Sequence, residues 1–140
     1  MKKYYLFLYK ETISYICSKI KPNEKKFEVI FLDEAIQFIE ELDRKSRKKI
    51  FYNIDKAQYT NDPELFKKLN NLIWEFRIKY NKFQYRILAF WDKTDKESTL
   101  VLTTQGFIKK TDKVPKLEIE KAERIRIEYF NSKNKGRAKQ

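Results

Sequence analysis

The sequence predicts an α+β domain, in which a twisted, mainly antiparallel sheet of about four strands is preceded by a helical hairpin and followed by one more helix. Three observations predict this class. Apolar residues alternate along much of residues 72–110, which is typical of half-buried strands. Apolar residues recur at three- and four-residue steps along residues 32–57, which is typical of amphipathic helices, and the same spacing returns after Pro115.

The composition predicts a soluble single domain with an anionic partner. The 140 residues include 32 Lys and Arg against 20 Asp and Glu, a net charge of +12 that favours RNA, DNA or an acidic protein. Cys17 is the single cysteine and there is no histidine, which excludes a disulfide framework, Cys-cluster zinc, His-ligated metals and catalysis by histidine. We therefore expect no metal and no cofactor. No stretch approaches the ~18 apolar residues of a membrane span, so we expect a cytoplasmic protein without membrane contact.

The chain divides into three segments. Residues 1–24 are an expected extension, in which helical spacing over residues 3–20 predicts an amphipathic helix that packs on the domain or on a partner. Its apolar run stops before Lys10 and no small-residue cleavage site follows, so it does not resemble an export signal. Residues 25–130 are the expected domain, and residues 131–140 (NSKNKGRAKQ) the expected disordered basic tail.

The domain begins with a short strand over residues 25–32, followed by the two helices of the hairpin. Asp33 is a candidate N-cap for the first helix and Ser46 for the second. Residues 60–63 (TNDP) end the second helix. Residues 64–71 (ELFKKLNN) are expected to be a polar connector that leads into the sheet.

Three further strands are expected, over residues 72–80, 84–91 and 99–108. Gly106 lies near the end of the last one, where a missing side chain allows a bulge or the close approach of a ligand. Residues 111–115 (TDKVP) then open the final helix.

Two arginines in these strands, Arg77 and Arg86, are candidate phosphate-binding residues. Alternation directs Arg77 away from the core, and a two-residue turn at Asn81 and Lys82 would place Arg86 directly opposite. A three-residue turn would put the two arginines on opposite faces. Two neighbouring arginines repel each other, and a bound phosphate would account for their placement side by side. The alternative is that both are solvated surface arginines and that Glu75 only neutralises Arg77.

The chain resembles the HigB-like, phage-derived branch of the RelE/ParE toxin superfamily in two strings, LIWEFRIKYNKFQYRILAFWD and GFIKKTDKVPKLEIEKAERIRIEYF. The resemblance covers residues 26–130 and implies a small RelE-like domain. Three separated motifs carry it: Trp74-Glu75-Phe76-Arg77, Tyr85-Arg86, and Gly106-Phe107 followed by Lys109-Lys110-Thr111 and Pro115.

The resemblance implies a toxin of a type II toxin–antitoxin pair, which enters the ribosomal A site and cleaves mRNA. In that reaction the ribose 2′-hydroxyl attacks the adjacent phosphodiester without a metal. The site then needs a base, an acid for the leaving 5′-oxygen, and positive charge around the phosphorane. The resemblance also implies a cognate antitoxin, a HigA-like helix-turn-helix protein.

Residue by residue, the resemblance implies catalytic roles for four cations. Arg77 and Arg86 match the family's sheet arginines and would hold the scissile phosphate. Lys109 and Lys110 match its lysine pair after the last strand, and one of them would stabilise the transition state or act as the base.

Three more lysines are expected to contact RNA. Lys67 and Lys68 lie where related toxins place lysines that contact RNA, and Lys79 follows Arg77 on the same strand face. The alternative for Lys67 and Lys68 is an ordinary solvated pair.

Gln105 and Phe107 complete the expected RNA-binding residues. Gln105 stands where related sequences often carry histidine, and its amide orients a phosphate or nucleotide but exchanges no proton near neutral pH. Phe107 is expected to share a face with Thr103 and Gln105 and either to stack on an extruded base or to be buried under the last helix. Alternation puts Tyr85 on the face opposite Arg86, which makes it a poor candidate for the acid.

Two other functions remain open on the same fold. A ParE-type gyrase poison would leave mRNA whole and damage DNA, and an inactive nucleic-acid-binding protein would do neither. Fold analogy does not separate these functions from RNA cleavage. The Gly-Phe-x-Lys-Lys string and the basic strand ends favour RNA.

Overall fold

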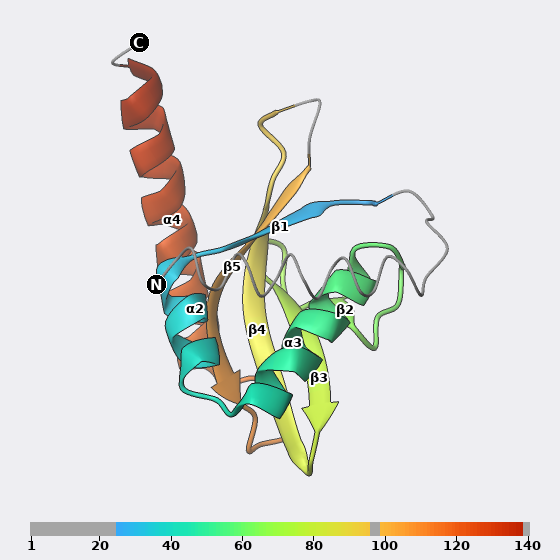
Figure 1. Cartoon of the computed structure of the whole chain (residues 1–140). Helices are drawn as coiled ribbons and strands as arrows, with labels where there is room; N and C mark the ends of the chain where they lie inside the picture. The colour runs from blue at the N-terminus through green and yellow to red at the C-terminus, as the bar shows by residue number, and fades with distance from the viewer. Residues whose placement is uncertain (1–24, 96–98, 139–140) are drawn as a thin grey trace.

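The computed structural model describes residues 25–95 and 99–138, which form a mixed five-stranded sheet with helices packed on both faces (Figure 1). The elements are β1 Glu28–Phe31, α2 Asp33–Glu40, α3 Arg44–Ala57, β2 Phe66–Lys68, β3 Trp74–Tyr80, β4 Phe83–Asp92, β5 Leu100–Ile108 and α4 Lys116–Ala138. The predicted α+β class, helical hairpin and C-terminal helix are confirmed. The helix expected over residues 3–20, and with it the extension 1–24, lies outside the described residues.

The strand order is β1-β5-β4-β3-β2, which is one strand more than predicted. The additional strand is β2, which lies within the expected polar connector 64–71 and pairs antiparallel with β3. A three-residue strand with two exposed lysines has no alternation to reveal it. β1 pairs parallel with β5, with Glu28 opposite Leu100, and the other neighbours pair antiparallel.

The hairpin between β3 and β4 closes through Asn81 and Lys82, which have φ values of 50° and 70°. Left-handed backbone at both central residues is typical of the type I′ turn, whose twist matches that of the strands. The predicted two-residue turn is confirmed, and Arg77 lies directly opposite Arg86.

The helical hairpin has a different cap from the one expected. Asp43, not Ser46, is the N-cap of α3: its Oδ1 accepts a hydrogen bond of 2.8 Å from the backbone N–H of Ser46. The Ser46 hydroxyl donates to the other oxygen of Asp43 at 2.8 Å, so Ser46 supports the cap from inside the helix. The N-cap of α2 is Leu32, without a side-chain hydrogen bond, and Asp33 lies in the first turn. A carboxylate in the first turn still stabilises the helix, because it interacts favourably with the positive end of the helix dipole.

Two apolar layers sit on opposite faces of the sheet. The layer under α2 and α3 includes Ile39, Ile50, Ile54, Phe76, Ile78 and Ile87. The layer under α4 includes Ile73, Leu88, Phe90, Leu102 and Ala122. Because neighbouring residues of a strand point to opposite faces, β3 and β4 supply side chains to both layers. Arg77, between Phe76 and Ile78, and Arg86, between Tyr85 and Ile87, therefore face the α4 side.

A bulge in β5 changes the expected side-chain order. The register shifts between Ile87 and Ala89, so that two residues of β5, Thr104 and Gln105, occupy the space opposite one residue of β4. As a result Thr103 faces the helical hairpin whereas Gln105 faces α4. The expectation that Thr103 shares a face with Gln105 and Phe107 is therefore wrong, because alternation was assumed to continue through the bulge.

Gly106 makes room for a helix, not for a ligand. A Cβ atom there would overlap the ring of Phe38 from α2 and lie 2.7 Å from Ile87 Cδ1. The missing side chain thus lets α2 approach β5 closely.

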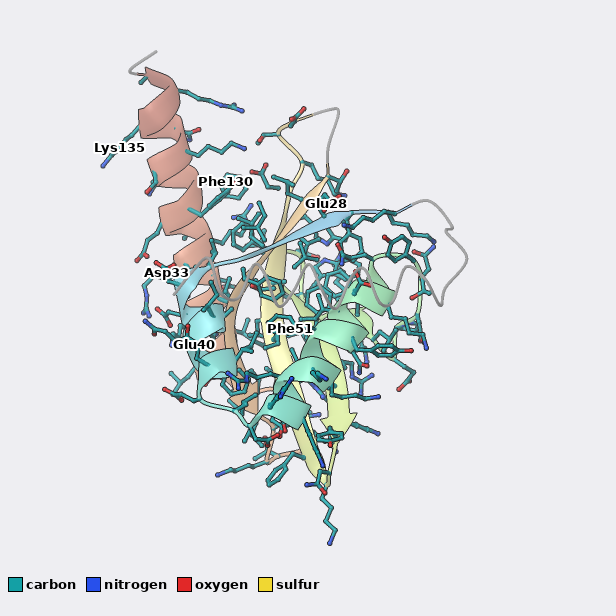
Figure 2. The ribbon with its side chains drawn as sticks, viewed as in Figure 1. Glu28, Asp33, Glu40, Phe51, Phe130 and Lys135 are labelled. Atoms are coloured by element: carbon teal, nitrogen blue, oxygen red, sulfur yellow. The ribbon has the colours of Figure 1, made fainter. Side chains whose placement is uncertain are left out.

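The last helix is longer than expected, because residues 131–138 of the expected disordered tail continue it as far as Ala138. Phe130 packs against Phe90 of the sheet with ring centroids 5.7 Å apart, whereas Lys135 one turn later points away from the body (Figure 2). In the part of the chain that the structure describes, no helix has the length and apolar character to cross a bilayer.

Candidate nucleic-acid interface

The sheet face on the α4 side brings most of the predicted site residues together. Residues that pair directly across strands share a face, and the register therefore groups them in three rows. The first row is Lys67 and Glu75, the second is Arg77, Arg86 and Phe107, and the third is Lys79 and Gln84. We call these seven residues the arginine face. The Lys109 backbone N–H donates to the Gln84 carbonyl at 2.7 Å, which places Lys109 at the end of the third row.

Arg86 is the most deeply buried member of the arginine face, with 0% of its surface exposed. Its guanidinium donates to the Tyr85 carbonyl at 3.0 Å and to Gln84 Oε1 at 3.1 Å. Its Nε lies 3.3 Å from Glu75 Oε2, which gives the buried cation a counter-charge. Burial lowers the pKa of Arg86 and Glu75 opposes that shift. Arginine nevertheless stays protonated in proteins, so Arg86 is a fixed internal charge.

Arg77 is the accessible arginine. Its side chain is 22% exposed, and its Nε lies 3.7 Å from Glu75 Oε1. One terminal nitrogen lies 3.8 Å from a carboxylate oxygen of Glu64, a largely exposed side chain. Both separations exceed hydrogen-bond length, and the Nε of Arg77 is buried without a hydrogen-bond partner. The exposed part of the Arg77 side chain, and not its Nε, is therefore what can meet an incoming anion.

Glu75 lies between the two arginines and neutralises part of their charge. Its carboxylate is buried, and Oε2 has an ion-pair partner but no hydrogen bond of good geometry. Directly paired Arg77 and Arg86 would otherwise repel each other across the strands. The carboxylate thus allows two like charges to occupy neighbouring positions without a bound anion.

The predicted lysines divide between the two sides of the sheet. Lys67 and Lys79 lie exposed on the arginine face. Lys68 pairs with Trp74 and so belongs to the opposite face, which removes it from the site. Lys109 is half-buried where β5 ends, and Lys110 is exposed one residue further along the loop.

Gln105 is a structural link in this protein. It is only 2% exposed, and its Nε2 donates to the backbone carbonyl of Glu118 at 2.7 Å and to that residue's Oε2 at 3.2 Å. The amide therefore ties the β5 bulge to the first turns of α4. Phe107 is half-buried and packs against the apolar layer under the same helix.

Tyr85 lies on the other face, as alternation predicts. It is buried there, and its hydroxyl donates to Ser46 Oγ at 3.2 Å. Within residues 25–95 and 99–138, no three His, Cys, Asp or Glu side chains gather closely enough to hold a metal ion.

Sequence reasoning missed Gln84 and Glu64 as partners of the arginines. Gln84 could have been found, because a two-residue turn puts it on the same face as Arg86, two residues away. Glu64 gave no such signal, since it precedes the unrecognised strand β2. The diagonal contact of Glu75 with Arg86 also follows from the predicted register, because diagonal neighbours across strands are within reach of long side chains.

The fold and this face define a small α+β domain with a cationic sheet surface. A family model described as phage-derived protein Gp49-like (DUF891) matches residues 37–126, and the chain belongs to that family. This confirms the predicted resemblance at the level of a phage-derived, RelE/HigB-like toxin-type family, which implies an antitoxin partner. A search of curated proteins gives no match.

Proposed function

We propose that the protein is the toxin of a type II toxin–antitoxin pair and that it cleaves mRNA in the ribosomal A site. The observation that carries this proposal is Arg77, a partly exposed arginine in the middle of a cationic sheet face, whose ion pairs of 3.7 and 3.8 Å are longer than hydrogen bonds. Membership in a toxin-type family supports the same function. The site of action is then the cytoplasm, where translating ribosomes are found.

In this proposal the RNA strand lies across the arginine face. The ribose 2′-hydroxyl loses its proton and bonds to phosphorus, the bond from phosphorus to the 5′-oxygen breaks, and the leaving oxygen takes up a proton. Arg77 donates to the non-bridging oxygens, whose negative charge grows in the phosphorane. Lys109 and Lys110 add charge from the adjacent loop, and one of them takes part in the proton transfer.

Arg86 has a different role in this proposal from the one the resemblance implies. A fully buried guanidinium with backbone and Gln84 partners does not reach a phosphate. We assign it as a positioning residue, which holds Glu75 and through that carboxylate the side chain of Arg77. Lys67 and Lys79 bind neighbouring phosphates along the strand, and the edge of Phe107 packs against a base.

The antitoxin in this proposal is a HigA-like protein. An acidic or amphipathic segment of it covers the arginine face and competes with RNA for Arg77. Its helix-turn-helix binds operator DNA, so that toxin, antitoxin and DNA form one regulatory complex.

The test is primer extension on a defined mRNA mixed with the purified protein, with and without programmed ribosomes. We expect cuts only with ribosomes and only at A-site codons. Arg77→Ala should lower the cleavage rate about 10²- to 10³-fold, as the loss of a donor to a transition-state oxyanion does. Lys68→Ala, which changes a lysine on the opposite face, is the matched control and should cleave normally.

Other outcomes separate the competing functions. Intact mRNA in all reactions, together with DNA cleavage complexes in a gyrase supercoiling assay, would replace this proposal by gyrase poisoning. Intact RNA and unaffected gyrase would identify a binding protein without either activity. Normal cleavage by Arg77→Ala would retain the nuclease and refute the assigned site.

A further inference from the structure

The outer surface of α3 carries a second concentration of positive charge, on the opposite side of the sheet from the arginine face. Arg44, Lys45 and Lys48 are exposed, and Lys49 and Lys56 are half-buried. With 3.6 residues per turn, these five cations occupy one continuous arc that lies opposite the apolar side of the helix. We call them the α3 basic stripe.

Tyr52 lies in the middle of the stripe. It is 38% exposed, and Lys49 Nζ lies 5.5 Å from its ring centroid. The stripe from Arg44 to Lys56 is about 18 Å long at 1.5 Å per residue. Cations distributed along the helix match the regular charge of a phosphate backbone, and the exposed Tyr52 ring lies among them.

The helix itself gives the stripe no exposed counter-charge. The single acidic residue of α3 is Asp55, which is 0% exposed and points into the protein. Within the described ranges 25–95 and 99–138, no cation of the stripe forms an ion pair. By contrast, α4 pairs Lys116 with Glu120 and places Lys121 against Glu34 of α2.

This arrangement of charges destabilises the helix. Arg44 and Lys48, and likewise Lys45 and Lys49, are like charges four residues apart, which repel each other on one helix face. Arg44 and Lys45 also lie in the first turn, where the helix dipole favours anions and where the N-cap Asp43 supplies a single carboxylate. Helix formation therefore does not explain the stripe.

We propose that the α3 basic stripe binds the phosphate backbone of a nucleic acid, as a contact separate from the arginine face. Its length matches about five phosphates of one strand, at about 3.4 Å of helix axis per phosphate. A protein partner fits less well, because the cores of protein interfaces are depleted of lysine and Tyr52 is the single exposed large apolar side chain of α3. The proposal does not rest on RNA cleavage, and a chain that cuts nothing would still bind through this stripe.

The test is fluorescence anisotropy of the full chain with a fluorescein-labelled 20-base-pair RNA duplex and with the DNA duplex of the same sequence. The variant is Arg44→Gln with Lys45→Gln and Lys48→Gln. The matched control is Lys116→Gln with Arg124→Gln and Lys135→Gln on α4, which removes the same charge from exposed positions. Affinities are measured at several salt concentrations, because each phosphate contact adds about 0.7 to 0.9 to the slope of log K against log salt.

We expect the α3 variant to lose at least 10-fold in affinity and about 2 units of salt slope, while the α4 control stays within 2-fold of the parent chain. The melting temperature of the α3 variant should equal or exceed that of the parent chain, because like-charge repulsion on the helix is removed. Equal losses in both variants would overturn the proposal, since binding would then follow net charge alone. A loss with RNA but not with DNA identifies RNA as the ligand; the reverse identifies DNA.

Discussion

Arg86 Nε lies 3.3 Å from Glu75 Oε2 in the sheet, and both side chains are buried. The same carboxylate lies 3.7 Å from Arg77 Nε, so one buried anion serves one buried and one accessible cation. The two arginines, which form a symmetric pair in the strand register, are therefore unequal in the folded protein. Replacing them should have different effects on stability.

Arg86→Ala should lower the free energy of unfolding by about 3 to 5 kcal/mol, because it leaves the Glu75 carboxylate buried without its partner. Arg77→Ala should cost less than about 1 kcal/mol, since its ion pairs are long and part of its side chain is in water. Urea denaturation of both variants measures the difference. Equal losses of stability in the two variants would show that Arg86 is not the main partner of the buried Glu75. The double variant Arg86→Met with Glu75→Gln, which removes both buried charges, should recover much of the stability.

Gly106→Ala should destabilise the protein by about 1 to 3 kcal/mol, because the added methyl overlaps Phe38 and overpacks the core. Gly136→Ala is the natural control, since a Cβ there meets nothing within 4 Å. Because it lies in the last turn of α4, it should stabilise by at most about 0.5 to 1 kcal/mol through helix propensity. Thermal denaturation compares the two, and recovery of Gly106→Ala by Phe38→Leu would identify the clash as the cause.

Asp55→Asn should change how stability depends on pH. Burial raises the pKa of Asp55 to about 6, against the opposing effect of Lys25. The pKa is thus higher in the folded state than the ~3.9 of an unfolded chain. The stabilisation from this group is present below about pH 4 and is lost as pH rises through about 6.

Asparagine does not ionise and should avoid that loss. The stability of Asp55→Asn relative to the parent chain should therefore be higher by about 2 kcal/mol at about pH 8 than at about pH 4. Urea denaturation at the two pH values measures this, with the exposed Asp112→Asn as the control. Parallel pH profiles of Asp55→Asn and the parent would contradict the raised pKa.

Asp92→Asn should loosen α4. Asp92 is buried at the end of β4 and accepts hydrogen bonds from Tyr129 Oη at 2.7 Å, Lys133 Nζ at 2.6 Å and Thr94 Oγ1 at 2.6 Å. Burial alone would raise the pKa of Asp92, but these donors outweigh it and lower the pKa well below its usual value. Loss of the charged acceptor should cost about 2 kcal/mol.

Hydrogen exchange localises this effect. The amides in the second half of α4 should exchange faster in Asp92→Asn, while those of α3 should keep the parent rates. Lys133→Ala should give a smaller change, because its side chain is 25% exposed and water replaces it in part. Unchanged exchange near Tyr129 would show that apolar packing alone holds the helix.

Sequence patterns predicted the long elements and the Arg77–Arg86 register, because alternation and turn chemistry act over neighbouring residues. They did not predict β2, which is too short to alternate. They allowed a bulge at Gly106, but alternation did not show that it lies at Thr104 and Gln105 and turns Gln105 toward α4. In the site, spacing correctly grouped Arg77, Arg86 and Lys79. Burial of Arg86 could not be read from spacing, because the chain around it that excludes water is distant in sequence.

The parallel pairing of β1 with β5 has a consequence for folding during synthesis on the ribosome. β1 is the first described strand to leave the ribosome, and its partner β5 is the last. Between Phe31 and Leu100 the ribosome needs several seconds at about 5 to 20 residues per second. The first strand waits through that interval without its neighbour, and this edge of the sheet forms only after β5 has been synthesised.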